Sequence, residues 1–331
     1  MHAATSRKGA AQHRKRTTLR ARRERLAPGS RWQGSPRTMR RMLAGLIRSL
    51  RPEQWSKNLF VLAPLVFGRR LTEAESLGRT LLAVALFCAA SSAVYVLNDL
   101  RDRDEDRRHP LKRRRPIAAG LVPPGLAAGS ALVLAGGALA GAGWLGRGVL
   151  LWTALYLALQ CVYSFGLKRV VILDIMLIAL GFGLRVLAGG AAASVPVSSW
   201  LLLCTLFLAL FLAFSKRRHE LELAEGDGTE HRAVLSQYSA GFLDQMINVV
   251  TASTVVAYAL YAISPSSDGG AGSDPMLWTV PLVLFGIFRY LYLVYQRPDE
   301  RSPTESLLAD APFLINLAIW GGAVLWIFYA R

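Results

Sequence analysis

Cysteine and charged residues are scarce in this 331-residue chain. The three cysteines, Cys88, Cys161 and Cys204, lie inside apolar runs without CxxC spacing, which excludes a disulfide framework and a cysteine zinc site. Charged residues make up 18% of the chain, against about 25% in an average soluble domain. Residues 1–41 also lack the apolar core of a secretory signal. These absences argue against a soluble enzyme with one packed core.

The net charge of +17 is concentrated near the N-terminus. Residues 1–41 contain 13 Lys and Arg and a single acid, Glu24. We expect this segment to be a basic, disordered cytoplasmic tail that is attracted to anionic lipid. Residues 42–331 are apolar and nearly balanced in charge, so we expect them to form the folded membrane domain. This distribution excludes a globular nucleic-acid binder.

Nine apolar segments follow the tail, each near the length of about 20 residues that crosses a hydrocarbon core. Their ranges are 53–69, 79–98, 121–143, 148–165, 171–190, 199–215, 243–263, 276–295 and 311–330. The first segment is the weakest, because Lys57 and Asn58 interrupt its start. The pattern predicts an all-α, polytopic membrane protein with nine transmembrane helices.

Basic residues lie mostly in alternate loops. The loops after the second, fourth, sixth and eighth segments contain 16 Lys and Arg, whereas the opposite loops contain four. Basic loops remain on the cytoplasmic side of a membrane. We therefore expect the N-terminus and the charged loops on the cytoplasmic face of the cytoplasmic membrane, with Arg331 outside.

The loop after the second segment combines acids with bases. Five acids fall within residues 99–106, and eight Lys and Arg fall within residues 101–115. If the helix continues past the membrane edge, one face carries four oxygen-bearing side chains: Asn98, Asp99, Asp102 and Asp106. Such ligands suit Mg²⁺ bound to substrate phosphates, and the bases can hold phosphate oxygens. Membrane topology explains the bases alone, so the acids predict a site for Mg²⁺ and diphosphate.

The pattern Asn98-Asp99-x-x-Asp102-x-x-x-Asp106 resembles the first aspartate-rich motif of the UbiA superfamily of intramembrane prenyltransferases. The similarity extends over most of residues 50–220 through four further segments: Arg51-Pro-Glu-Gln-Trp-Ser-Lys-Asn58, Arg115-Pro-Ile-Ala-Ala-Gly120, Tyr163-Ser-Phe-Gly-Leu-Lys168 and Arg185-x-x-Ala-Gly-Gly190. The resemblance implies a nine-helix UbiA-like catalytic domain with its active site on the cytoplasmic side.

Within the superfamily, residues 98–120 are most similar to enzymes that transfer phosphoribose to decaprenyl phosphate. Aromatic prenyltransferases carry a second carboxylate cluster after the fourth helix, where this sequence has only Asp174 before Arg185. The resemblance implies Mg²⁺-dependent transfer of 5-phosphoribose from phosphoribosyl diphosphate to a polyprenyl phosphate, a precursor step for cell-wall arabinan. The expected partners are these two substrates and the membrane but no nucleic acid, and a homo-oligomer stays open as an alternative to a monomer.

The residue pattern and the resemblance together assign individual roles. Asp99, Asp102 and Asp106 are expected to hold Mg²⁺ and to act in catalysis. The expected substrate-binding residues are Lys57, Asn58, Asn98, Lys112, Arg115, Tyr163, Lys168, Asp174, Lys216, Arg217 and Glu220. Glu220 is expected to orient the two cations before it. For Lys57 and Lys168 the competing explanation is snorkelling. For Lys216 and Arg217 it is ordinary positive-inside charge.

Two further cations, Arg185 and Arg289, lie within apolar segments. An unpaired guanidinium in a membrane costs about 3 kcal/mol or more, so Arg185 needs a partner inside the bundle. Asp174 lies about three helical turns before it and is one candidate for an ion pair. The topology places Arg185 toward the far side, which argues against a catalytic role. Arg289 has no partner that is visible in the sequence.

Three other functions stay open. The first is a UbiA-type enzyme that attaches a polyprenyl chain from prenyl diphosphate to an aromatic acceptor. The second is a transporter or channel, against which the acids cluster in a loop and no inverted repeat is visible. The third is an electrostatic membrane scaffold that acts through residues 1–41.

Overall fold

The computed structural model describes residues 36–110, 112–227, 235–264, 274–296, 306–307 and 309–330. The chain divides into two compact units, Met1–Ala44 and Gly45–Arg331. Most of the predicted basic tail lies outside the described residues. Its last part begins helix α2 (Pro36–Ser49).

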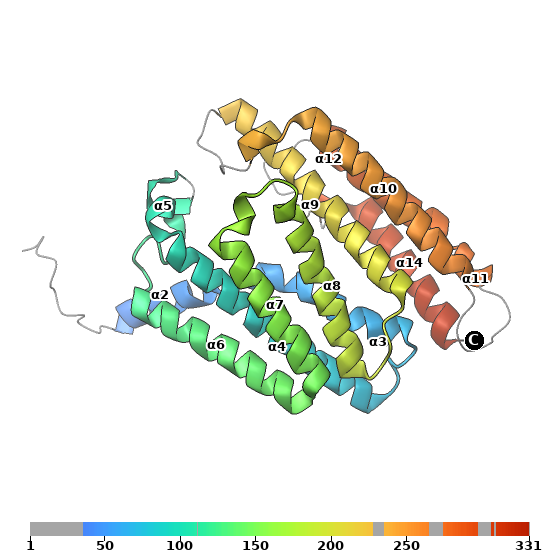
Figure 1. Ribbon diagram of the computed structural model, residues 1–331, viewed down its shortest axis with the longest axis horizontal. Helices are drawn as coiled ribbons and strands as arrows, with labels where there is room; N and C mark the ends of the chain where they lie inside the picture. Colours follow the sequence, from blue (N-terminus) through green and yellow to red (C-terminus); the bar gives the residue numbers. More distant parts are fainter. Residues whose placement is uncertain are drawn as a thin grey trace, which may run out of the picture. The chain divides into compact units, whose positions relative to one another are not determined.

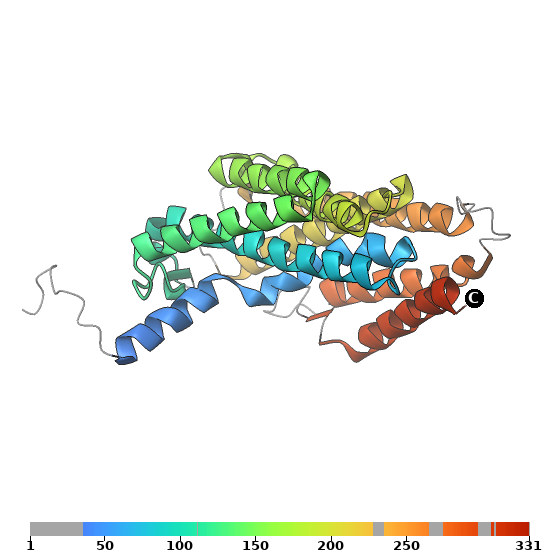
Figure 2. The ribbon, with the colours of Figure 1, turned by 90° about the horizontal axis from the view of Figure 1, so that it is seen from below.

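Within the described ranges, eight helices are long and apolar enough to cross a membrane. They are α4 (Ala74–Arg101), α6 (Pro124–Leu145), α7 (Arg147–Phe165), α8 (Leu173–Ala193), α9 (Ser199–Asp227), α10 (Ala240–Ile263), α12 (Val280–Gln296), which the short α11 (Asp274–Leu277) precedes, and α14 (Ala311–Tyr329). Figures 1 and 2 show these helices side by side, and no strand occurs in the described part of the chain. The predicted all-α, multi-pass membrane fold is confirmed.

The first predicted span differs from the other eight. It consists of a 3₁₀ helix, η1 (Pro52–Leu62), followed by the short helix α3 (Ala63–Phe67). A 3₁₀ run of this length is uncommon and often marks a functional or strained segment. Two polar side chains, Lys57 and Asn58, occupy its middle. The expected count of nine is therefore approximately met, with one segment broken rather than a continuous α-helix.

Helix α8 is the most enclosed of the long helices. In its most apolar stretch 67% of the residues are buried, against 6% in α14. On one side, a buried cluster joins Ile175 of α8 to side chains from α9, α10 and α12. On another, Ala188 and Ala192 pack with residues from η1, α4, α6 and α7. Both apolar cores therefore meet at α8, which places its polar side chains inside the bundle.

The 3₁₀ segment crosses α8 at Gly189. A Cβ atom added to Gly189 would lie 1.9 Å from the carbonyl oxygen of Val61, so only glycine allows this approach of the two backbones. Gly190 is also tightly enclosed, because an added Cβ would lie 2.4 Å from a methyl carbon of Val197. The Gly-Gly pair of the sequence therefore fixes η1 against α8 and brings Asn58 beside the interior of the bundle.

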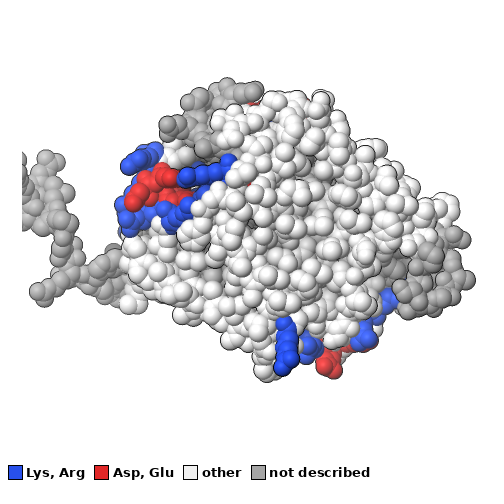
Figure 3. Space-filling model, viewed as in Figure 1, with Lys and Arg blue, Asp and Glu red and all other residues white. Residues whose placement is uncertain are grey.

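Charged side chains are unevenly distributed over the surface. On the face shown in Figure 3 they gather at two opposite edges, and the surface between these edges carries almost none. The larger group lies over α5 (Arg103–Arg108) and the residues around it. An uncharged belt between two charged edges is the surface that a bilayer requires, because charge is costly in hydrocarbon.

Candidate active site

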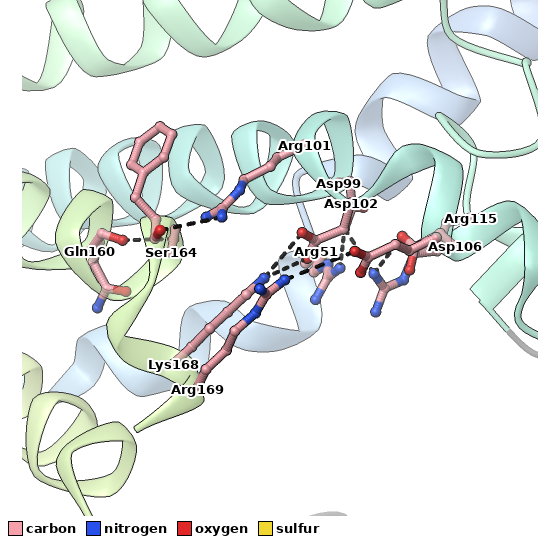
Figure 4. Close-up of polar contacts among 12 residues, drawn as sticks. Arg51, Asp99, Arg101, Asp102, Asp106, Arg115, Gln160, Ser164, Lys168 and Arg169 are labelled. Carbon is pink, nitrogen blue, oxygen red and sulfur yellow. Dashed lines mark hydrogen bonds and ion pairs between the residues drawn. The ribbon is translucent and has the colours of Figure 1, made fainter. Parts of the chain in front are cut away.

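The acidic stripe predicted from the sequence spans a bend between two helices. Helix α4 ends at Arg101, and α5 begins after Asp102. The amide of Asp102 donates to the Asn98 carbonyl at 2.9 Å, and the amide of Asp106 donates to the Asp102 carbonyl at 2.8 Å. Because these bonds preserve the four-residue spacing, Asp99, Asp102 and Asp106 lie close together (Figure 4).

Two of these carboxylates share one arginine. Nη1 of Arg115 lies 2.8 Å from Oδ2 of Asp106 and 3.3 Å from Oδ1 of Asp99. Nη2 of Arg51, from the start of η1, lies 2.5 Å from the same oxygen of Asp99. Asp99 and Asp106 are only 2% and 3% exposed. Carboxylates buried this far need such partners, because an isolated buried charge is very costly.

The third carboxylate pairs with a lysine from another part of the chain. Nζ of Lys168 lies 3.1 and 2.9 Å from the two oxygens of Asp102. Lys168 belongs to η3 (Leu167–Arg169), the turn that follows α7. Figure 4 shows Lys168 and Arg169 reaching from this turn toward the acidic side chains. Three cations and three acids therefore balance in charge; we call them the acid–base cluster: Arg51, Asp99, Asp102, Asp106, Arg115 and Lys168.

A second charged network lies deeper, around Arg217 of α9. Nε of Arg217 lies 3.0 Å from Oδ2 of Asp174, and Nη1 lies 2.6 Å from Oε2 of Glu220. The hydroxyl of Tyr238 donates to Oδ1 of Asp174 at 2.8 Å. Lys216 lies 3.9 Å from Glu220. Glu220 thus contacts both cations that it was expected to orient, and Asp174, with no exposed surface, has both oxygens bonded.

Tyr238 fixes the start of α8 as well as Asp174. Its hydroxyl accepts from the amide of Ile172 at 2.6 Å. Ile172 has a φ of 69°, which is strained for a β-branched residue. Burial, followed by the hydrogen bond to the Asp174 carboxylate, raises the pKa of Tyr238 to about 12. The phenol is therefore protonated at neutral pH and stays a donor to Asp174.

Arg185 has partners inside the bundle, as expected, but Asp174 is not one of them. Its Nε donates to Oδ1 of Asn58 at 2.8 Å, and its two Nη atoms donate to the Gly181 carbonyl and the Tyr156 hydroxyl, both at 2.9 Å. The candidate ion pair with Asp174 is therefore wrong. Asp174 instead pairs with Arg217, because α9 packs beside the start of α8.

Arg289 acquires a partner that the sequence did not reveal. Its Nε and Nη2 atoms lie 3.0 and 2.8 Å from the two oxygens of Asp310, at the start of α14. Oδ1 of Asp310 also accepts from the amide of Phe313, as an N-cap. This bidentate pair joins α12 to α14 and gives the arginine, which is partly exposed, a structural partner.

Several other predicted residues belong to the elements that carry the acid–base cluster or lie near the second charged network. Asn98 lines a groove of about 310 Å³ between α4 and α7, whose remaining walls are mostly apolar. Arg101, at the same end, donates to the Phe165 carbonyl at 3.3 Å and lies over that ring. Tyr163 lies within electrostatic reach of Arg217. Lys112 belongs to η2 (Lys112–Arg114), beside the cluster's Arg115.

The chemistry of the acid–base cluster suits Mg²⁺, although its carboxylates are paired with bases. Asp99 and Asp106 converge on one cationic atom, Nη1 of Arg115, so their oxygens can share a positive charge. Asp102 faces Lys168 instead. In the described ranges, no three His, Cys, Asp or Glu side chains are gathered as a metal site. Carboxylate oxygens are ligands that Mg²⁺ prefers, but here they are bonded to the cations of the cluster, so the three-carboxylate site stays a prediction.

Sequence reasoning missed three residues that organise these networks. Arg51 opens a motif that was recognised but was given no role, although it pairs with Asp99. Tyr156 binds Arg185 from α7 and Tyr238 binds Asp174 from the segment before α10. No spacing in the sequence identifies these two tyrosines, because their partners lie 29 and 64 residues away.

Several known proteins are similar to this chain over most of its length. A decaprenyl-phosphate phosphoribosyltransferase from Mycolicibacterium smegmatis is 37% identical over 292 residues, which cover 86% of this chain and 92% of that protein. One from Mycobacterium tuberculosis is 40% identical over 253 residues, covering 75% and 83%. The solved structure of a UbiA homologue from Archaeoglobus fulgidus bound to DMAPP and Mg²⁺ has a TM-score of 0.66 at 21% identity, covering 85% of this chain and 98% of its own.

The family assignment follows from a match to most of the chain. The UbiA prenyltransferase family model matches residues 61–320, a range that includes α4 to α12 and most of α14. The acidic stripe on α4, the lysine after α7 and the Gly-Gly pair of α8 all fall within it. This chain belongs to the UbiA prenyltransferase family.

Proposed function

We propose that this protein transfers 5-phosphoribose from phosphoribosyl diphosphate to a polyprenyl phosphate of the decaprenyl type. An oxygen of the acceptor phosphate forms a bond to the anomeric carbon, and the bond from that carbon to the diphosphate oxygen breaks. Diphosphate leaves with the electron pair. The acceptor phosphate is already ionised at neutral pH, so the reaction needs positioning and charge stabilisation more than a general base.

The burial and bonding of Asp174 favour this function over prenyl transfer to an aromatic acceptor. Prenyl diphosphate enzymes of this fold are expected to use a second carboxylate cluster after the fourth helix. Here the corresponding acid is fully buried and bonded to Arg217 and Tyr238. Relatives named decaprenyl-phosphate phosphoribosyltransferases, matched over 83–92% of their own length, support the same choice.

The acid–base cluster supplies the groups that a diphosphate leaving group needs. Arg51, Arg115 and Lys168 are 20–31% exposed on their side chains and can turn from the carboxylates to phosphate oxygens. Arginine binds such oxygens in a bidentate manner. Asp99, Asp102 and Asp106 would hold Mg²⁺, which would neutralise charge on the departing diphosphate. Lys216 and Arg217, both in contact with Glu220, would bind the phosphates of the donor.

We place the active site on the cytoplasmic side of the cytoplasmic membrane. The acid–base cluster lies at the end of α4 where the sequence has eight Lys and Arg within residues 101–115, and such loops remain cytoplasmic. A soluble, highly charged donor reaches the site from that side, whereas the acceptor arrives within the membrane.

A two-substrate assay tests the proposal. Purified protein receives labelled phosphoribosyl diphosphate with a polyprenyl phosphate, or labelled prenyl diphosphate with an aromatic acid. We expect labelled lipid only from the first pair. Product only from the second pair would establish the aromatic prenyltransferase instead, and flux of substrate into liposomes without any product would favour a transporter.

A further inference from the structure

Lys57 and Arg185 are cations of the bundle that pair with no carboxylate of another described residue. Arg185 is 5% exposed, and its three hydrogen bonds go to neutral groups of Asn58, Tyr156 and Gly181. Lys57, which is half-buried in η1, forms no hydrogen bond or ion pair with another described residue. Elsewhere in the interior, Arg51 pairs with Asp99 and Arg217 with Asp174.

These two cations lie near one another and near further positive charge. Arg185 donates to Asn58, the residue directly after Lys57. Lys57 also lies within electrostatic reach of Arg51, Arg185 and Lys216. Cations placed together in a low-dielectric interior repel one another. The arrangement therefore calls for an anion, and two uncompensated charges match the dianion of a phosphate monoester.

The surrounding hydrogen bonds hold this pair of cations in a fixed position. Nδ2 of Asn58 donates to Oγ of Ser91 at 3.2 Å while its oxygen accepts from Arg185. Asn58 is fully buried, and the contact of Val61 with Gly189 fixes the segment that carries it. Arg185 itself lies 4.6 Å above the ring centroid of Tyr156. Such preorganised donors are typical of binding sites.

The acid–base cluster and the pair of Lys57 and Arg185 both adjoin one face of α4. Asp99, Tyr95 and Ser91 are four residues apart in sequence and so share a helix face. Asp99 belongs to the acid–base cluster, and Ser91 bonds to Asn58, the partner of Arg185. Eight residues of α-helix span about 12 Å. Ser91, which bonds to the Asn58 partner of Arg185, therefore lies about that far along α4 from Asp99. Lys57 lies within electrostatic reach of Arg185 and of Arg51 in the acid–base cluster.

We propose that Lys57 and Arg185 form a separate site for the phosphate monoester of the lipid acceptor, while the acid–base cluster receives the diphosphate of the donor. This inference rests on the proposed function. A lipid phosphate reaches a depth of the bundle to which a soluble donor has less access, because its hydrocarbon chain keeps it within the membrane. Lys57 contacts the substrate directly in this arrangement, and Arg185 fixes the inner end of the site.

Initial rates of the full-length protein test the assignment. Lys57→Gln removes the charge of a side chain that bonds to no other described residue, so the fold is expected to survive. We expect the apparent KM for the polyprenyl phosphate to rise at least about tenfold, as for loss of a charged hydrogen bond, while the KM for the donor changes less than about twofold. Lys57→Arg is expected to recover most of the affinity. The matched control is Arg147→Gln, which alters an exposed arginine at the start of α7, the end of that helix away from Lys168.

A rise in the donor KM with an unchanged acceptor KM would overturn the assignment and place a donor phosphate at Lys57. Unchanged values for both substrates would also overturn it.

Direct binding without the donor separates this inference from the proposed function. Binding of farnesyl phosphate, farnesol and inorganic phosphate is measured by titration calorimetry on wild type, Lys57→Gln and Arg185→Lys. We expect farnesyl phosphate to bind wild type and to lose at least about tenfold affinity in Lys57→Gln, with farnesol unaffected. Equal binding of farnesyl phosphate to wild type and Lys57→Gln would contradict the site even if the enzyme transfers phosphoribose. If Lys57→Gln weakens the binding of inorganic phosphate but not of farnesyl phosphate, the ligand is a soluble phosphate and the lipid assignment is overturned.

Discussion

Nη1 of Arg115 lies 2.8 Å from Oδ2 of Asp106, and five of the eight residues between them in the sequence are Lys or Arg. The same nitrogen reaches Asp99 at 3.3 Å, so one guanidinium joins α5 to the end of α4. Both carboxylates are almost fully buried. Arg115 therefore holds the two carboxylates close together. In the proposed reaction, Mg²⁺ would take over this bridging role.

Substitution of Arg115 should disturb both the site and the position of these carboxylates. Arg115→Gln leaves Asp99 paired with Arg51 and removes the described cationic partner of Asp106. We expect at least about a tenfold loss of phosphoribosyl transfer, since a charged hydrogen bond is worth about 1.5–3 kcal/mol. Arg115→Lys keeps the charge but not the two-armed geometry and should recover only part of the rate. Initial rates at saturating substrates check this, and a fully active glutamine variant would contradict it.

The buried pair of Arg217 and Asp174 should matter more for stability than any pair on the surface. Asp174→Asn leaves the guanidinium of Arg217, 3% exposed, with Glu220 as its remaining acidic partner. Removal of one member of a buried pair costs about 3–5 kcal/mol. The control is Arg70→Gln, which breaks the half-exposed pair with Glu73 and should cost less than about 1 kcal/mol. Thermal denaturation in detergent measures both, and equal shifts of the apparent Tm would refute the difference.

The crossing of η1 over α8 predicts a sharp distinction between two glycines. Gly189→Ala places a Cβ against the Val61 carbonyl, so we expect a lower apparent Tm, by an amount that corresponds to at least about 1–3 kcal/mol. Gly137→Ala, on α6, meets no atom within 4 Å and should leave stability unchanged or slightly higher. The comparison fails if Gly189→Ala is as stable as Gly137→Ala.

Much of the helical architecture could be predicted from the sequence, because each long helix carries its own apolar run. The acidic stripe was also predictable, since residues 98–106 follow one helical period. The first span was predicted less well. Its backbone packs against Gly189, more than 120 residues later in the sequence. A local hydropathy pattern contains no information about that contact.

The partners of the intramembrane charges could not be predicted for the same reason. Arg185 bonds to Asn58 across 127 residues, whereas Asp174, on the same helix as Arg185, points to Arg217 on α9. Periodicity shows that Asp174 and Arg185 lie about three turns apart. It does not show which neighbouring helix packs beside each of them, and that packing decides the pairs.

Removal of divalent metal should stop the reaction. Mg²⁺ at the acid–base cluster would neutralise the charge of the diphosphate. The three cations of the cluster alone do not supply this charge, because they already neutralise its three carboxylates. We expect treatment with EDTA to reduce phosphoribosyl transfer to background and added Mg²⁺ to restore it. The unfolding temperature, measured in parallel, should change little, because Arg51, Arg115 and Lys168 already neutralise the acids. Full activity in EDTA would contradict the metal requirement.

The most direct test of the account is the donor assay on Asp99→Asn, Asp102→Asn and Asp106→Asn. Each variant keeps the size of the side chain but loses the negative charge that would hold Mg²⁺. We predict that each inserts into the membrane as wild type does and transfers phosphoribose at least about a hundredfold more slowly, as expected when charge stabilisation of a leaving group is lost. Near-normal rates in all three variants would contradict the central role of the acidic stripe.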